Sequence, residues 1–521
     1  MNKINALLHK LFGTTPNDGD IQPKEALAFS VAGFGQNLIC TVIGSYITVF
    51  MTDAIGFAAL PVALLMLFTR LFDAANDPIM GSIVDFTRTK WGKCRPYLKW
   101  MAIPVAVMTI LCFLPVYGND TASFVGISIV YVVWSVVYTI VDVPYWGLST
   151  AMTNDTYKRG NFLTIARLIC MAGAGLVTIV LPQITSAITN SVNADFGGNT
   201  ALAAPVIGEK LKWTYFIAAA VCSVVAIPLF YVGFKGTKER VEQTEKVASL
   251  KHNLKLLFKN KPLMLIVLSG ILGAARMGFT YTGGLYFAKY VLADVTFLGA
   301  QGEGIYTFMT LAILPGGLIA SVLVPFFTKK IGKKNTYIWS HILGFIGLGA
   351  AFIVGLINKS SGYTDTATMV VFFIGIIIAG IPSGFTNILT YAMIGDTVEY
   401  LELKTGERAE GICFAMQTFI SKVGMAVGAF IGVLSYNIAN VEANNAAALD
   451  QAGKDTMWWM LVGLGAISML ATIIPLFFYK FNEKQQQEAI AIIKERKLQA
   501  KLAEEGEVES EVAESETVVE E

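Results

Sequence analysis

The chain has 521 residues, a formal charge of +1 and a hydrophobic fraction of 54%. Only 15% of its residues are charged, against about 25% in an ordinary soluble domain, which excludes a soluble enzyme, a disordered chain and a nucleic-acid-binding protein. Twelve segments are apolar and long enough to cross about 30 Å of hydrocarbon as helices, so we expect an all-α polytopic membrane protein. In chain order these segments are 27–51, 57–84, 99–117, 123–150, 162–189, 213–234, 262–291, 303–327, 336–357, 367–393, 411–438 and 456–479.

The distribution of Lys and Arg predicts how these segments are oriented. Loops after even-numbered segments carry 21 of these residues, and loops after odd-numbered segments carry five. By the positive-inside rule, both termini of this multi-pass chain should lie on the cytoplasmic side of the cell membrane, and we expect a bacterial cell. Residues 1–24 are polar and have no signal-peptide core. The six cysteines are scattered and form no CxxC motif, so we expect core residues, not disulfides or metal ligands.

A short internal repeat divides the chain into two halves. The stretch from Asp85 to Lys93 aligns with the stretch from Pro325 to Lys333 at an offset of 240 residues, and each follows the second of six segments. This repeat predicts two six-helix bundles, the arrangement of a secondary transporter with its site between the halves near the bilayer midplane. The expected parts are a cytoplasmic N-terminal segment 1–26, bundles at 27–234 and 262–480, a basic linker 235–261 and a cytoplasmic tail 481–521.

The end of the tail hides a charge asymmetry. From position 504 onward the chain contains nine Glu and no Lys or Arg, so the rest of the chain has a net charge of +10. Such a segment cannot bury enough apolar surface to fold, and we expect it to be disordered. A solubilising tail is one interpretation, and a regulatory contact is the other.

Charged residues inside the apolar segments need partners. A charge at the bilayer centre costs at least about 2.5–3.5 kcal/mol, so these residues must pair or line a wet cavity. The second segment carries Arg70, Asp73, Asn76 and Asp77 on one helical face. Two carboxylates and an amide oxygen suit Na⁺ or a shared proton; the alternative is a structural cluster in which Arg70 neutralises one Asp. In all, seven charged residues lie well inside the apolar segments, and we call them the deep charges: Arg70, Asp73, Asp77, Asp142, Arg167, Arg276 and Lys422.

The fourth segment carries Trp134, Tyr138, Asp142 and Trp146 at intervals of four residues, which places them on one face. Aromatic rings pack against the C–H faces of sugars, and a carboxylate accepts hydrogen bonds from sugar hydroxyls. The stripe therefore predicts a sugar site. The alternative is ordinary packing of buried aromatic side chains.

The remaining deep cations have less specific environments. Lys422 follows Thr418 by four residues, and we expect the lysine to neutralise a carboxylate of the second or fourth segment. Arg167 lies near the start of its segment, where an ordinary gate ion pair is the alternative to substrate binding. Arg276 has no carboxylate within its own segment. Two hypotheses remain for Arg276: a salt bridge to another helix, or binding of an anionic substrate such as a hexuronide.

Charges are also expected to form a cytoplasmic gate. Asp396 and Glu399, followed by Arg408, are expected in the loop after the tenth segment, on the same side as Arg88 and Arg159. Salt bridges between the halves could form and break there as the bundles rock. A solvated charged loop is the alternative.

Several of these motifs resemble the glycoside–pentoside–hexuronide:cation symporters. The resemblance covers roughly residues 25–480 and is carried by motifs that occur in the family's order. It implies a major facilitator fold of twelve transmembrane helices. The motifs are Arg70–Gly81 with Trp91-Gly92-Lys93, Asp142–Trp146, Gly395–Tyr400, and Gln417-Thr418 with Lys422.

The resemblance also implies roles for single residues. Lys422 matches the lysine between the family's two sites, whereas Asn37 departs from the pattern, since melibiose-type members have an aspartate there. A galactoside is therefore not the expected substrate. The implied cation-binding set is Asp73, Asn76, Asp77 and Thr139, with Na⁺ possible at Asp73 and Asp77. The expected substrate-binding set is Asn37, Tyr138, Asp142, Trp146, Arg167, Arg276 and Thr418.

Together these observations predict a symporter that imports a glycoside, pentoside or hexuronide with Na⁺ or H⁺ by alternating access. We expect no enzymatic activity and no cofactor besides the coupling ion. The expected partners are a sugar, a monovalent cation and the lipid bilayer, and not nucleic acid; the monomer should be functional. The alternatives are a sodium-coupled lipid carrier of the same fold and a sugar sensor that binds without transport. An ATP-driven pump is unsupported, because the chain has no GxxxxGK[ST] loop.

Overall fold

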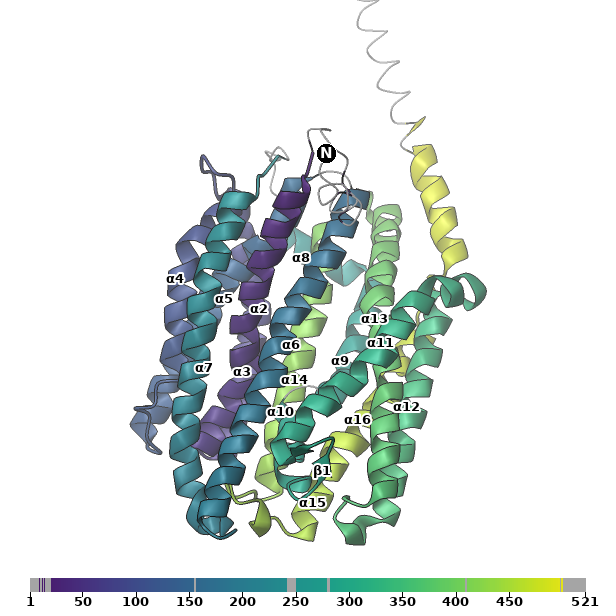
Figure 1. Cartoon of the computed structure of the whole chain (residues 1–521). Coiled ribbons are helices and arrows are strands. Elements are labelled where there is room, and N and C mark those ends of the chain that lie inside the picture. The colour runs from purple at the N-terminus through teal and green to yellow at the C-terminus, as the bar shows by residue number, and fades with distance from the viewer. Residues whose placement is uncertain are drawn as a thin grey trace, which may run out of the picture.

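The computed structural model describes residues 20–153, 156–240, 250–278, 282–407 and 410–496, together with a few isolated positions near the termini. Long helices run side by side from one end of the molecule to the other (Figure 1). Within the described residues, ten helices are long and apolar enough to cross a membrane. The helix α4 and a broken helical pass from α9 to η3 pack beside them. This arrangement agrees with the predicted helical membrane protein.

The first half, called the N-half, is the set of helices before residue 237. Its first helix continues into a π-helical turn, and the others are uninterrupted. The elements are α2 (Pro23–Val49), η1 (Phe50–Ile55), α3 (Ala59–Phe86), α4 (Arg95–Cys112), α5 (Thr121–Met152), α6 (Thr156–Asp195) and α7 (Thr200–Gly236).

The second half, called the C-half, begins with a short amphipathic helix and contains one small hairpin, which the all-α prediction did not include. Its first elements are α8 (Leu250–Lys259), α9 (Lys261–Leu272), η2 (Ala274–Gly278), α10 (Thr282–Tyr286), η3 (Phe287–Val291), β1 (Thr296–Phe297), β2 (Ala300–Gln301) and η4 (Gly302–Gly304). The later ones are α11 (Ile305–Ile331), α12 (Lys333–Ile357), η5 (Lys359–Ser361), α13 (Thr366–Thr405), α14 (Glu410–Ile438), η6 (Ala446–Ala448), α15 (Gln451–Trp458), η7 (Trp459–Gly463) and α16 (Leu464–Phe477).

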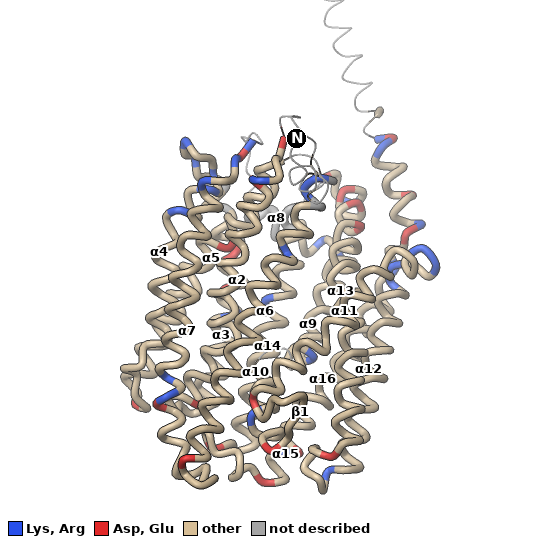
Figure 2. The backbone as a smooth tube through the Cα atoms, viewed as in Figure 1, with Lys and Arg blue, Asp and Glu red and all other residues tan. Residues whose placement is uncertain are grey.

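The two ends of the molecule differ in charge. Lys and Arg gather where α2 and α4 begin and where α3, α7 and α11 end, which we call the basic end (Figure 2). The other end, which we call the opposite end, holds η1, η3, the hairpin and the loop between α14 and α15. The tail is helical over residues 483–496, and the acidic segment from 504 lies outside the described residues.

Several helices extend beyond their predicted bounds. The helix α13 continues to Thr405, so Asp396 and Glu399 lie on a helix and not in the expected loop. The helix α7 begins at Thr200, and the predicted loop before residue 213 is helical. Hydropathy marks only the apolar part of a helix, whereas backbone hydrogen bonding continues until a cap ends it. At α5 the cap is Asp120, which accepts hydrogen bonds from the Ser123 N–H at 2.9 Å and from its hydroxyl, and these bonds lower the pKa of Asp120.

The seventh predicted segment is not one continuous helix, as 262–291 implied. The helix α9 ends at Leu272, and a 3-10 turn follows before α10. Glycine permits close packing at this break: a Cβ on Gly273 would collide with the Thr472 hydroxyl, and one on Gly283 would lie 2.6 Å from Leu461. Hydropathy averaged over the whole segment does not locate such a break, although the stretch from Gly273 to Gly284 contains four glycines and Arg276.

The predicted internal repeat has a structural counterpart. Glu239, just after the last helix of the N-half, accepts hydrogen bonds from the backbone N–H groups of Lys93, Cys94 and Arg95 at 2.8–2.9 Å. Glu483, just after the last helix of the C-half, accepts one from the N–H of Lys333 at 2.6 Å. Each carboxylate therefore binds at the start of its own half's third helix, where N–H groups lack helical partners.

Candidate functional site

Two carboxylates of α3 are paired with different partners at mid-height. Asp73 is 5% exposed and accepts a hydrogen bond from the Ser135 hydroxyl of α5, and Arg70 approaches it to 3.7 Å. Asp77 forms an ion pair with Lys422 of α14. The structure thus brings α3, α5 and α14 together around two acids and two bases. The formal charges cancel, which is what a cluster inside a membrane requires.

The other two residues expected at the cation site lie close by. Asn76 is half-buried on α3, and Thr139 is buried on α5 one turn beyond Ser135. Ser135 is a carboxylate partner that the sequence analysis missed. Its position one helical turn before Thr139 was the available signal, because residues four apart on a helix share a face.

The predicted sugar-site carboxylate, Asp142, accepts a hydrogen bond from the side-chain amide of Gln36 on α2. The neighbouring Asn37, which the sequence analysis placed in the substrate site, donates to the Gly33 carbonyl of its own helix at 2.9 Å. Gln36 is buried, and its amide oxygen has no partner within the described residues. Asp142 also interacts electrostatically with Lys422 and Asp77. The expected sugar and cation clusters are therefore adjacent.

The aromatic stripe of α5 divides into two parts. Trp134 donates to the Thr109 hydroxyl of α4 at 2.8 Å, and Tyr138 stacks on it with ring centres 5.0 Å apart. These two rings pack within the N-half, so the packing alternative describes them. Trp146 instead faces Arg167, whose guanidinium lies 5.4 Å from the indole ring. Half of the stripe thus remains as a substrate candidate.

Arg167 of α6 reaches across to the C-half. Its guanidinium lies 5.9 Å from the ring of Tyr391 on α13 and 3.5 Å from the Tyr391 hydroxyl. Arg167 is thus flanked by one aromatic ring from each half, Trp146 and Tyr391. A substrate bound between the halves could contact this guanidinium. Tyr391 was not identified from the sequence, because no motif marks it.

Two expected substrate residues are not brought into this group. Arg276 lies on η2 within the C-half, and its described hydrogen bond goes to the Gly273 carbonyl at 3.2 Å. The cross-helix salt bridge to an α3 or α5 carboxylate is not among the ion pairs of the described residues. Thr418 lies exposed on α14, one turn from Lys422, without a described side-chain partner.

The residues expected at the cytoplasmic gate have their described contacts within their own halves in this conformation. Asp396 binds Lys333 at 2.6 Å, and Glu399 accepts from Gln486, so both contact their own half. Arg88 donates to the neighbouring Thr87 carbonyl, Arg159 lies on α6, and Arg408 lies outside the described residues. In this conformation α12 and the 483–496 helix offer partners to α13 within the same bundle, and the gate between the halves stays a prediction.

The halves are instead joined at the opposite end. Asp53 of η1 accepts hydrogen bonds from the Lys289 ammonium at 2.5 Å and from the Tyr290 hydroxyl at 2.7 Å, both on η3. Asn444 binds Lys289 at 2.8 Å and the Asp53 carbonyl at 2.6 Å. Asp53 is 2% exposed and Lys289 6%. Neither residue was predicted as a partner, because Asp53 lies just beyond the first apolar segment and Lys289 lies at the end of the seventh.

Further contacts close the same end. Thr52 hydrogen bonds to Tyr286 at 2.6 Å, and Thr185 of α6 donates to Glu303 of η4. One continuous cluster of buried apolar residues includes N-half residues together with Tyr286 and Tyr436, whereas the cluster at the basic end of the C-half contains only C-half residues. Among the described residues, the hydrogen bonds and ion pairs between halves lie at the opposite end and at mid-height. The structure is closed at the opposite end.

Comparisons with known proteins agree with this architecture. The family described as MFS/sugar transport protein matches residues 28–483. The isoprimeverose transporter of Lactiplantibacillus pentosus is 29% identical over 465 residues, covering 88% of this chain and 89% of that protein. The glucuronide carrier protein homolog of Escherichia coli K12 is 27% identical over 474 residues, covering 90% and 95%.

Solved structures show the same fold. A D-xylose–proton symporter aligns with a TM-score of 0.54 at 13% identity, covering 88% of this chain and 97% of that one. The nucleoside transporter NupG aligns with a TM-score of 0.55 at 15% identity, covering 88% and 100%. At these identities, the structural likeness concerns the fold alone.

Proposed function

Because the chain belongs to the MFS/sugar transport protein family, we propose that it is a symporter that moves a sugar together with Na⁺ or H⁺ across the bacterial cytoplasmic membrane. The observation that supports it most directly is the ion pair between Asp77 and Lys422, which joins the halves beside Asp142. A cation that binds the α3 carboxylates must compete with Lys422. Cation binding thereby changes the electrostatic surroundings of the expected sugar site, which is a physical route to coupling.

The proposed division of roles follows the two clusters. Asp73, Asp77 and Asn76, with Ser135 and Thr139 on α5, would hold the cation through oxygen ligands or by protonation of a carboxylate. Asp142 would accept hydrogen bonds from sugar hydroxyls, and Trp146 would pack against the ring. Arg167, placed between two aromatic rings, would contact a hydroxyl or carboxylate of the substrate.

The proposed substrate class is a glycoside, pentoside or hexuronide. Relatives named for isoprimeverose and glucuronide transport support this class. A lipid carrier of the same fold is less well supported, because the acids and bases at mid-height suit a polar substrate. If the substrate is anionic, such as a hexuronide, Arg167 is better placed to bind its carboxylate than Arg276. Arg167 lies beside Trp146 and Tyr391, one ring from each half, whereas Arg276 lies within the C-half.

We also propose that the basic end faces the cytoplasm, with both termini on that side, as the positive-inside rule predicts. The conformation would then be inward-facing, since the opposite end is closed. The monomer would be the transport unit, because the proposed cation and sugar residues lie between its own two halves.

The test is uptake of radiolabelled isoprimeverose and of a glucuronide into proteoliposomes, with an imposed Na⁺ or H⁺ gradient. We expect one gradient to drive accumulation, and Asp77→Asn to abolish accumulation while counterflow or binding persists. Asp120→Asn, a surface carboxylate change, serves as the control. Accumulation by Asp77→Asn at the wild-type level would contradict the proposed cation role. Sugar binding without counterflow would instead indicate a sensor.

A further inference from the structure

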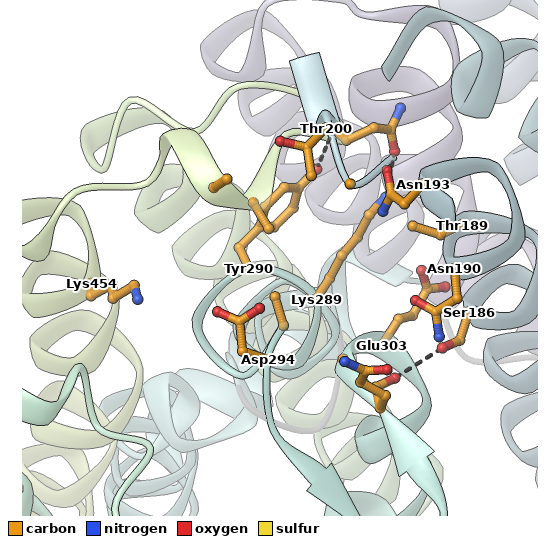
Figure 3. A pocket seen from close by; sticks show the side chains of 17 residues that line it. Ser186, Thr189, Asn190, Asn193, Thr200, Lys289, Tyr290, Asp294, Glu303 and Lys454 are labelled. Atoms are coloured by element: carbon orange, nitrogen blue, oxygen red, sulfur yellow. Dashed lines mark hydrogen bonds between the residues drawn. The ribbon is translucent and has the colours of Figure 1, made fainter. Parts of the chain in front are cut away.

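A polar cavity of about 340 Å³ lies between the halves at the opposite end. One wall is a face of α6 (Figure 3). It is formed by Ser186 and by the residues three, four and seven positions after it, which are Thr189, Asn190 and Asn193. The facing wall comes from the C-half, from η3 to η4 and from the loop between α14 and α15. The cavity is therefore complete only when this end is closed.

The cavity has a buried floor and an exposed rim. Glu303 and Lys289 at the floor are 3% and 6% exposed, whereas Asn190, Asp294 and Gln301 at the rim are exposed. Figure 3 shows the α6 side chains directed toward Lys289 and Glu303. A solute can thus enter from the solvent on this side without opening the halves.

Three buried oxygens that line the cavity lack hydrogen-bond partners within the described residues. They are Oε2 of Glu303, Oδ1 of Asn193 and Oγ1 of Thr189. The other Glu303 oxygen is bound by Thr185, so Glu303 is fixed with one oxygen free. Buried acceptors without donors are unfavourable, and native structures usually satisfy them with water or a ligand. All three oxygens can accept a hydrogen bond from a hydroxyl group.

The lining defines the chemical class of the ligand. Lys289 is already neutralised by Asp53, so Lys454 alone faces the two acids Asp294 and Glu303, and the lining has a formal charge of −1 that disfavours an anionic ligand. The remaining polar groups are hydroxyls and amides, which both donate and accept. An apolar ligand would leave them unsatisfied, and the volume is within the range of small-molecule sites. The lining therefore fits a neutral polyhydroxylated molecule.

We propose that this cavity, lined by α6 and by the C-half from η3 to η4, is a second sugar site, separate from the one between Asp142 and Arg167. Its occupant contacts both halves and so stabilises the conformation closed at this end. With the basic end in the cytoplasm, the site faces outward. High external sugar then slows import by delaying reopening. The sugar class rests on the proposed function, but the site itself does not require transport.

The test is isoprimeverose binding to the full-length protein in nanodiscs, by calorimetry. Asp142→Asn with Trp146→Ala disables the proposed central site, and we expect binding with lower affinity to remain. Adding Asn193→Leu should weaken the remaining binding at least tenfold, and Thr189→Val, a near-isosteric change, should weaken it severalfold. Ser191→Leu, on the exposed side of α6, is the matched control. A glucuronide should bind the outer site less well than the neutral sugar.

Transport provides a second readout. In proteoliposomes, uptake by the wild type should fall at high external isoprimeverose, and Asn193→Leu should remove this fall while leaving uptake at low concentration unchanged. The proposal is overturned if the Asp142→Asn/Trp146→Ala protein binds no sugar, because the cavity then holds only water. It is also overturned if Asn193→Leu and Thr189→Val change neither the remaining sugar binding nor the fall of uptake at high external sugar. If the wild type binds isoprimeverose with a dependence on Asn193 but not on Asp142, the outer site stands and the proposed central site fails.

Discussion

Replacing Asp53 with asparagine is expected to open the opposite end of the molecule. Asp53 and Lys289 are buried together, and the Lys289 ammonium is held by Asp53 and by Asn444 at 2.5 and 2.8 Å. Asparagine keeps the size of the side chain and can still hydrogen bond to Tyr290. It removes the negative charge and leaves the lysine charge buried without a counter-ion.

The magnitude follows from the burial of the pair. Removing one partner of a buried ion pair costs about 3–5 kcal/mol. This cost falls on the conformation closed at the opposite end, because separation of the halves exposes both side chains to water. The equilibrium between conformations should therefore shift toward opening by a factor between about one hundred and several thousand. A closed state favoured by one hundredfold would become the minor state.

The assay measures exposure of a cysteine introduced at Thr307, in a background without the six native cysteines. Thr307 is 4% exposed and makes only long hydrogen bonds across the interface, at 3.3 and 3.4 Å. We expect a membrane-impermeant maleimide to label it at least tenfold faster in Asp53→Asn than in the parent. Lys289→Met should act in the same direction, and Asp120→Asn should not.

A double-mutant cycle gives the decisive comparison. Asp53→Asn with Lys289→Met removes both charges, so the labelling rate should return toward that of the parent. Unchanged labelling in both single variants would refute the gate, because it would show that the pair does not hold this end closed. If the change in opening free energy of the double variant equals the sum of the two single changes, the gate is also refuted, because the residues are then uncoupled.

Three further results are expected. Asp142→Asn should weaken sugar binding about ten- to one hundred-fold, since hydrogen bonds to a charged group contribute about 1.5–3 kcal/mol; normal affinity by calorimetry would leave Asp142 without a role in binding. Glu239→Gln should lower the stability of the protein by about 1–3 kcal/mol, measured by thermal unfolding, because three backbone N–H groups lose a charged acceptor; the exposed change Glu209→Gln is the control, and equal unfolding temperatures would contradict the account. Tyr391→Leu should weaken substrate binding about two- to thirtyfold, whereas Tyr391→Phe should have little effect, because the cation–π contact with Arg167 needs the ring and not the hydroxyl; similar losses in both variants would assign the effect to the hydroxyl.

The sequence predicted the architecture well, because hydropathy and the Lys and Arg distribution respond directly to the membrane. It did not predict where helices end or break. The helix α13 continues to Thr405 after its apolar part is complete, and α9 ends at Leu272 inside a segment that hydropathy marks as one span. Both features depend on caps and on close helix packing. Such packing becomes visible only when the facing residue, here Thr472 opposite Gly273, is known.

For the site, the sequence indicated which residues need partners but not which partners they have. A lysine in an apolar segment requires a carboxylate, so a partner for Lys422 on α3 or α5 was foreseeable, but the choice of Asp77 was not. The α2 side chain that binds Asp142 is Gln36, which was not predicted; it precedes the expected substrate residue Asn37 by one position, a rotation of about 100° around the helix. The pair of Asp53 and Lys289 left no pattern, because its members are 236 positions apart.

The two ion pairs between the halves differ in what can replace them. Asp53 and Lys289 lie under Tyr290 and Asn444, so only separation of the halves frees them. Asp77 and Lys422 lie next to Asp73, where a cation can take the place of the lysine ammonium. On the proposed function, Lys422 compensates Asp77 after cation and sugar leave, so the empty carrier does not return with an unpaired carboxylate in the membrane. An unpaired charge there costs at least about 2.5 kcal/mol, and that cost would slow the return step about sixtyfold or more. Lys422→Gln should therefore slow net uptake far more than it weakens sugar binding.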